Sequence, residues 1–156
     1  MEKIPSASDR SGKIFPFPES ARAVQPEGKV GRKILLVEDH DSSGDVFTTI
    51  VQHLGYQAIR ATNGKDAIKR SVLEQPDLIV MDIMMPTMDG IEATRQIKRT
   101  NAAHIPIVIL TAAVESGMHV NALSAGAAEV LIKPITIADL SKTLRKYLPY
   151  KSSAPV

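Results

Sequence analysis

The sequence lacks cysteine, and it lacks any apolar run long enough to cross a membrane. Without cysteine the chain forms neither disulfides nor thiolate metal sites, which fits a reducing cytoplasm. A membrane-spanning helix needs about 20 predominantly apolar residues. Residues 1–10 carry charges and a proline where a secretory signal needs an apolar segment. We therefore expect a cytoplasmic protein with no membrane partner.

A strong excess of charge of one sign is also missing. The chain has 19 Lys and Arg against 17 Asp and Glu, so no overall field favours nucleic acid or an anionic surface. Its 156 residues, 44% of them hydrophobic, suffice for one buried core but are few for two. Because only a few residues follow the last amphipathic segment, we expect no DNA-binding output domain and no nucleic-acid partner.

The N-terminal part has four prolines among serine, glycine and charged residues, and no sustained helical or strand period. We expect a disordered arm over residues 1–31, one folded domain over 32–149 and a C-terminal tail over 150–156. The aromatic cluster at 14–17 has two interpretations, a docking motif or part of a tail without a partner, and we favour the second.

After the arm, five short apolar segments alternate with five amphipathic segments. The apolar segments, which predict strands, span 34–37, 57–61, 77–81, 107–110 and 129–132. The amphipathic segments, which predict helices, lie at about 42–54, 63–72, 91–97, 115–125 and 137–148. Continuous apolar strands need cover on both faces. The alternation therefore predicts a doubly wound parallel α/β sheet in three layers, α/β/α, with right-handed crossovers.

Several helix starts carry residues that favour capping. Ser42 and Ser43 are expected to cap the first helix, and Asn63 to open the second. Thr136, followed three residues later by Asp139, resembles a capping box at the start of the last helix.

Polar residues follow four of the predicted strands. They are Glu38, Asp39, Asp82, Thr111 and Lys133. In a doubly wound sheet the ligand site lies beyond the carboxyl ends of the strands, where the strand order reverses. We therefore expect these five residues to converge on one site.

The chemistry of these residues suits a phosphoryl group beside a metal ion. Three carboxylates in one site repel one another and raise at least one pKa unless a cation lies between them. Magnesium prefers oxygen ligands and keeps water and phosphate oxygens in its shell. Lys133 offers a fixed positive charge and Thr111 a hydroxyl, which suit a phosphoryl group. Asp82 is the candidate nucleophile because its strand is central, whereas Glu38 and Asp39 are candidate metal ligands.

The segments LLVED, IVMDIMMPTMDG, ILTA and LIKP occur in this order and resemble the signatures of response-regulator receiver domains of two-component systems. The resemblance covers about residues 32–149. It implies a flavodoxin-like sheet with strand order 2-1-3-4-5, as in single-domain chemotaxis receivers. It also implies a phosphoprotein that accepts its phosphoryl group from a histidine kinase or a histidine phosphotransfer protein. Such a domain signals to a downstream protein, which the sequence does not identify, and is not an enzyme.

The resemblance also assigns roles to individual residues. The implied Mg2+ ligands are Glu38, Asp39, Asp82 and the Met84 carbonyl. The implied residues that act on the phosphoryl group are the phosphoacceptor Asp82 together with Thr111 and Lys133. The resemblance further implies that the Lys133–Pro134 peptide is cis.

One position departs from the family. Receivers place Tyr or Phe three residues before the lysine, where the ring moves with the switch threonine, and here the pair is Thr111 and Val130. Because valine has no ring to move, we expect the signal to pass through residues 115–125, which follow Thr111 closely. This segment has only Val120 and Leu123 as clear apolar anchors, so we expect a weak helix.

Two other classes of protein that bind ligands at strand ends need residues that this chain lacks. A haloacid-dehalogenase-type phosphatase needs a second Asp two positions after the nucleophile, where this chain has Met84. A nucleotide-binding domain needs a Gly-rich turn after the first strand, and residues 38–44 contain none. We expect His40 to be an exposed polar neighbour of the acidic pair. Two alternatives stay open, a degenerate receiver that acts as a constitutive protein-interaction module and a receiver fragment of a hybrid histidine kinase.

Overall fold

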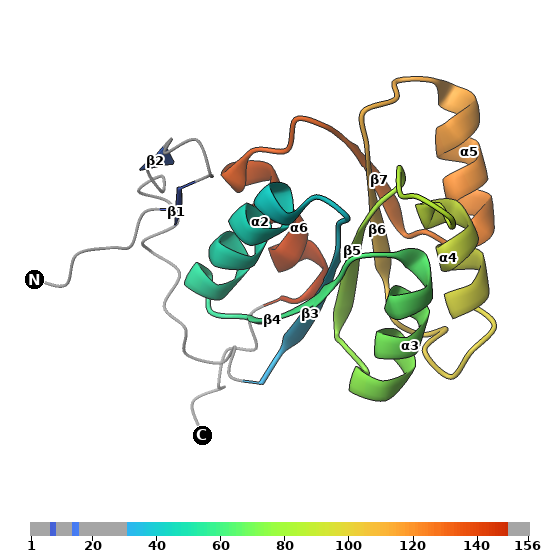
Figure 1. Cartoon of the computed structure of the whole chain (residues 1–156), viewed down its shortest axis with the longest axis horizontal. Helices are drawn as coiled ribbons and strands as arrows, with labels where there is room; N and C mark the ends of the chain where they lie inside the picture. Colours follow the sequence, from blue (N-terminus) through green and yellow to red (C-terminus); the bar gives the residue numbers. More distant parts are fainter. Residues whose placement is uncertain (1–6, 9–13, 16–30, 150–156) are drawn as a thin grey trace, which may run out of the picture.

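All five strands expected from the apolar segments are present in the computed structural model of the chain (Figure 1). The structure describes residues 7–8, 14–15 and 31–149. The strands are β3 (Lys33–Val37), β4 (Gln57–Ala61), β5 (Leu78–Asp82), β6 (Ile107–Thr111) and β7 (Glu129–Ile132). The helices that follow them are α2 (Asp41–His53), α3 (Gly64–Glu74), α4 (Gly90–Ile97), α5 (Ser116–Ala125) and α6 (Ile137–Tyr147).

These strands form one parallel sheet in the order β4-β3-β5-β6-β7. Counted from β3, this is the order 2-1-3-4-5, so the predicted flavodoxin-like fold is confirmed. The chain moves from β3 to one edge of the sheet and then from β5 to the other edge. The order therefore reverses between β3 and β5, which is where a doubly wound sheet binds its ligands.

The sheet has an apolar cluster on each face. In β3, Ile34 and Leu36 belong to one cluster and Leu35 and Val37 to the other, as the alternation of strand side chains requires. Helices α2 and α6 complete the first cluster, and α3, α4 and α5 complete the second. Figure 1 shows the two groups of helices on opposite sides of the sheet. The predicted three layers are therefore present.

The capping residues were predicted correctly at two helices and wrongly at a third. The Asn63 side chain accepts a hydrogen bond from the backbone N–H three residues later at 2.8 Å. The capping box at Thr136 is also present. The prediction for Ser42 and Ser43 is wrong, because α2 already begins at Asp41 and both serines lie in its first turn. The negative charge of Asp41 favours this earlier start through the helix dipole.

Helix α5 packs through small residues. Val120 and Leu123, the expected anchors, are 58% and 51% exposed, so that prediction is wrong. The buried residues of α5 are Ala122 and Ala125. Apolar residues occur on both sides of this helix, and their positions alone do not determine which side faces the core.

Within the segment expected to be an arm, β1 (Ala7–Ser8) and β2 (Ile14–Phe15) form a two-stranded antiparallel pair. The rest of residues 1–30, with part of the aromatic cluster at 14–17, lies outside the described residues, as do residues 150–156. The disordered arm and the tail therefore stay predictions. No helix in the described part of the chain combines the length and the apolar character that a membrane crossing requires.

Candidate functional site

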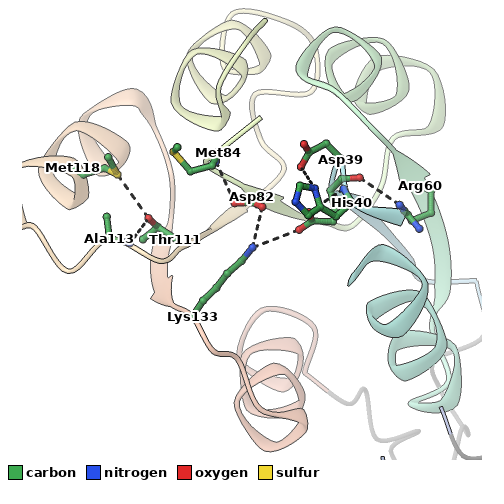
Figure 2. A network of polar contacts seen from close by, with 10 residues as sticks. Asp39, His40, Arg60, Asp82, Met84, Thr111, Ala113, Met118 and Lys133 are labelled. Carbon is green, nitrogen blue, oxygen red and sulfur yellow. Dashed lines mark hydrogen bonds and ion pairs between the residues drawn. The ribbon is translucent and has the colours of Figure 1, made fainter. Parts of the chain in front are cut away.

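Four strands bring polar residues together at the carboxyl-terminal end of the sheet (Figure 2). Asp82 ends β5, Thr111 ends β6, and Glu38 directly follows β3. Lys133 directly follows β7, and its side chain points toward Asp82 (Figure 2). The carboxyl ends of parallel strands all lie at the same end of the sheet, so residues far apart in the sequence share one site.

Lys133 links two carboxylates. Its Nζ donates to Asp82 Oδ2 at 2.9 Å and lies 3.5 Å from Glu38 Oε2. Burial alone lowers the pKa of Lys133, but the hydrogen bond and charge of Asp82, together with the charge of Glu38, outweigh burial and raise this pKa. Lys133 therefore stays positively charged between the two carboxylates. The Lys133–Pro134 peptide is cis, as predicted.

The Asp82 carboxylate is held from two sides. The residue is only 6% exposed. Its Oδ1 accepts a hydrogen bond from the Met84 backbone N–H at 3.2 Å, and its Oδ2 accepts the bond from Lys133. The Met84 side chain, by contrast, is 68% exposed. The strand end and the following loop therefore fix the direction of the Asp82 carboxylate.

Glu38 and Asp39 form an acidic pair next to Lys133. Among the described residues, the side chains of Glu38, Asp39 and His40 place their ligand atoms within 4.8 Å of one another. Burial and the charge of Asp82 raise the pKa of Glu38, against a hydrogen bond from the His40 N–H and the charge of Lys133. Asp39 Oδ1 is buried and accepts no hydrogen bond from the described residues, although His40 Nδ1 lies 3.3 Å away.

The donor atoms of this group fit Mg2+. A cation at this position would contact the Asp39 oxygen that accepts no hydrogen bond from the described residues, and it would relieve the repulsion between neighbouring carboxylates. Mg2+ prefers oxygen to imidazole nitrogen, so Asp82 is a more suitable further ligand than His40. The His40 side chain is 73% exposed.

Two residues at the site had no role predicted from the sequence, although Gly90 lies in the segment IVMDIMMPTMDG. Gly90, at the start of α4, lies so close to the Asp82 backbone that a Cβ there would be 2.5 Å from the Asp82 carbonyl oxygen. Arg60, on β4, donates from Nη2 to the Glu38 carbonyl oxygen at 3.3 Å (Figure 2). The glycine directly after the acidic residue of the MDG segment is a signal for Gly90. A contact between two strand ends offers no such signal for Arg60.

The hydroxyl of Thr111 is engaged on the α5 side of the site (Figure 2). It donates to Met118 Sδ at 3.7 Å and accepts a hydrogen bond from the Ala113 N–H at 3.0 Å. Val130 and Met118 are both half-buried and pack against the same apolar cluster. A methionine of α5 therefore contacts the threonine directly, while a valine occupies the position of the family's aromatic residue.

Comparisons with known proteins agree with this geometry. The sequence model of the response regulator receiver domain matches residues 34–145. The polar-differentiation response regulator DivK of Brucella anthropi is 30% identical over 118 residues, which are 75% of this chain and 96% of DivK. The alkaline phosphatase synthesis transcriptional regulatory protein PhoP of Bacillus subtilis is 34% identical over 119 residues, which are 76% of this chain but 49% of PhoP. The chain thus spans about half the length of PhoP.

A solved structure shows the same fold. The receiver domain of the sensor histidine kinase PA1611 from Pseudomonas aeruginosa, which has a magnesium ion coordinated in its active-site cleft, is similar with a TM-score of 0.70 and 34% identity. The similarity covers 76% of this chain and 98% of that domain. The fold, the match to the family over most of the described residues and the relatives together show that the chain belongs to the response regulator receiver domain family.

Proposed function

We propose that Asp82 accepts a phosphoryl group from a phosphohistidine on a histidine kinase or a histidine phosphotransfer protein, as a step of two-component signalling. The observation that carries this proposal is the buried Asp82 carboxylate at the end of the central strand, with the charged Lys133 Nζ at 2.9 Å. Phosphoryl transfer needs little more than a positioned nucleophile and neutralisation of charge.

We propose Mg2+ as the cofactor of this reaction. Its ligands are Glu38, Asp39, Asp82 and the Met84 carbonyl. Two observations support this choice: the buried Asp39 oxygen that accepts no hydrogen bond from the described residues, and the magnesium ion in the similar receiver domain. Burial, followed by the charge of Asp82, raises the pKa of Glu38, and this crowding of carboxylates also favours a cation. When bound, Mg2+ neutralises charge on the phosphoryl oxygens.

The residues of the chain itself perform the remaining steps. A carboxylate oxygen of Asp82 forms the new P–O bond as the P–N bond of the donor breaks. Lys133 already lies beside Asp82 and neutralises the charge that the phosphoryl group adds. The Thr111 hydroxyl donates a hydrogen bond to a phosphoryl oxygen. To do so it gives up its hydrogen bond to Met118 Sδ, which is a weak acceptor.

The phosphorylated chain then signals through contacts with a downstream protein in the cytoplasm, and it is not an enzyme toward other substrates. The similarity to DivK over 96% of that protein favours a regulator that consists mainly of this domain. The similarity to the PA1611 receiver instead favours a receiver within a histidine kinase. Val130 favours a further candidate, a receiver whose contacts with partners do not depend on phosphorylation.

Phosphorylation by acetyl phosphate in the presence of MgCl2 tests the proposed nucleophile. We expect the wild type to take up the label and Asp82→Asn to take up none, because the amide is not a nucleophile and has nearly the same volume as the carboxylate. Asp77→Asn is the matched control, since the exposed Asp77 directly precedes β5 and accepts a hydrogen bond from the Lys33 N–H. Equal labelling of Asp82→Asn and the control would place the acceptor elsewhere.

A further inference from the structure

The guanidinium of Arg60 contacts the acidic end of β3 and the side of α2. Its Nη2 donates to the Glu38 carbonyl oxygen at 3.3 Å, and its Nη1 donates to Asp45 Oδ1 at 3.3 Å. The Glu38 N–H donates to the carbonyl oxygen of Ala61, the next residue on β4, at 3.1 Å. Both polar backbone groups of Glu38 are therefore anchored to adjacent residues of β4.

Arg60 reaches this position because residue 44 has no side chain. A Cβ on Gly44 would lie 2.1 Å from both Cζ and Nη2 of Arg60. Gly44 is buried and lies inside α2, where glycine is less favourable than alanine. The close approach of the guanidinium gives a physical reason for glycine at this position.

The contact with Glu38 bears directly on Asp39. The Glu38 carbonyl belongs to the peptide that joins Glu38 to Asp39, so a hydrogen bond to it fixes the plane from which the Asp39 side chain leaves the backbone. Asp39 Oδ1 is buried and accepts no hydrogen bond from the described residues, and His40 Nδ1, which lies 3.3 Å from it, belongs to a side chain that is 73% exposed. The orientation of this carboxylate therefore depends mainly on its backbone.

We propose that Arg60 is a positioning residue for the Mg2+ site, acting through the Glu38–Asp39 peptide from a place that Gly44 leaves open. This inference rests on the proposed function, because the site it orients is the proposed one. The Asp45 pair alone does not account for the arrangement, since the Asp45 side chain is 65% exposed and solvent screens such pairs. The Arg60 side chain is only 23% exposed, and its Nε is buried without a hydrogen bond.

Titration of the full chain with MgCl2 by isothermal calorimetry tests the proposal. We expect Arg60→Ala to weaken Mg2+ binding by about tenfold, as residues that orient metal ligands commonly do. Gly44→Ala should weaken binding in the same direction, because the new methyl group displaces the end of a flexible side chain and leaves the helix intact. The double variant should bind no more weakly than Arg60→Ala alone. Urea unfolding confirms that each variant is folded under the titration conditions.

The matched control is Arg70→Ala, which removes the same charge from an arginine that pairs with Asp66 on α3. This variant should bind Mg2+ with wild-type affinity. A second readout needs no metal: the amide resonance of Asp39 should shift in metal-free Arg60→Ala and not in Arg70→Ala.

The outcomes separate this inference from the proposed function. If the wild type binds Mg2+ and Arg60→Ala binds it equally well, Arg60 does not position the site. Losses in Gly44→Ala and Arg60→Ala that multiply in the double variant would also overturn the inference, because they would be independent. A wild type that binds no Mg2+ would overturn the proposed cofactor and this inference together.

Discussion

At the scale of single residues, the charge of the site depends on one shared lysine. Lys133 forms ion pairs with both Asp82 and Glu38, and it balances only one of these two carboxylates. Asp39 adds a third carboxylate to the same edge of the sheet. The uncompensated negative charge favours a divalent cation, so the lysine alone does not complete the site.

Another residue-scale contact joins the end of α6 to the start of β7. The Tyr147 hydroxyl donates to Glu129 Oε2 at 2.8 Å, and Lys146 Nζ donates to the same oxygen at 3.1 Å. Burial, followed by the hydrogen bond and charge of Glu129, raises the pKa of Tyr147 to about 12. Burial alone raises the pKa of Glu129, but the hydrogen bonds from Tyr147 and Lys146 outweigh it and lower this pKa.

We predict that Tyr147→Phe lowers the free energy of unfolding by about 1 kcal/mol at neutral pH, since solvent partly screens this hydrogen bond. The folded-state pKa of Tyr147 lies above the usual tyrosine value of 10.0, so the contribution of its hydrogen bond is complete below pH 10.0 and is lost as the pH rises toward about 12. The stability difference between the wild type and the variant should therefore shrink over this range. Urea unfolding at pH values on both sides of 10.0 measures it, and a constant difference would contradict the assignment.

The residues that were predictable from the sequence share one property. Each of Glu38, Asp82, Thr111 and Lys133 follows or ends an apolar strand, and the topology alone brings strand ends together. Arg60 has no such position, because its role depends on Gly44 in a helix that precedes its own strand in the chain. Contacts of this kind require the packed structure.

At the scale of elements, α5 lacks the side-chain cap that α3, α4 and α6 have. Its N-cap, Glu115, makes no side-chain capping bond, and Gly117 lies in its first turn. The residues that it buries are alanines, which remove little apolar surface from water. The Thr111 hydroxyl donates a hydrogen bond to Sδ of Met118 in the same helix, and a thioether sulfur is a weak acceptor. We therefore expect a change in the position of α5 to cost less free energy than a similar change in the capped helices.

We predict that beryllofluoride, which mimics the phosphoryl group, changes amide hydrogen exchange mainly in residues 112–125. The mimic draws the Thr111 hydroxyl away from Met118 and releases the start of α5, whereas Val130 offers no ring to carry the change toward α6. Smaller changes are expected in residues 137–148. Exchange measured by mass spectrometry with and without the mimic tests this route.

The control for this prediction is Thr111→Val, which removes the hydroxyl that connects the site to Met118. In this variant the change in residues 112–125 should be much smaller, even if the mimic still binds. Protection that changes chiefly in residues 137–148 of the wild type would show that the signal takes another route. No change in either segment would favour the receiver whose contacts do not depend on phosphorylation.

The elements themselves were predictable where a local signal decides the structure. Asn63 and Thr136 cap their helices because each supplies an acceptor directly before the first turn. The packed face of α5 was not predictable, because alanines face the core while Val120 and Leu123 point outward. The more hydrophobic residues of α5 are therefore the more exposed ones. Which face of the helix is buried is determined by the elements that pack against it.

At the scale of the whole molecule, the site lies at the end of a strand that both apolar clusters share. Leu78 and Val80 of β5 belong to one cluster, Ile79 and Met81 to the other, and Asp82 follows directly. A domain of this size with a common sheet is expected to unfold as one unit. A ligand that binds only the folded site therefore stabilises the whole domain.

We predict from this linkage that Mg2+ raises the free energy of unfolding. A ligand present at about 100 times its dissociation constant adds about 2.7 kcal/mol when it binds one site of the folded state only. Urea unfolding at increasing MgCl2 measures the gain, and its dependence on concentration gives a dissociation constant to compare with calorimetry. Ionic strength is held constant with NaCl, so that general screening of charges does not contribute to the difference.

Glu38→Ala combined with Asp39→Ala should abolish this gain, because the variant loses two of the three carboxylates proposed as Mg2+ ligands, whose ligand atoms lie within 4.8 Å of each other. The single variant Asp77→Asn, at the opposite end of β5, should keep the full gain, since its side chain hydrogen-bonds to the Lys33 N–H and not to the site. If the double variant is stabilised by Mg2+ as strongly as the wild type, the ion binds elsewhere on the chain.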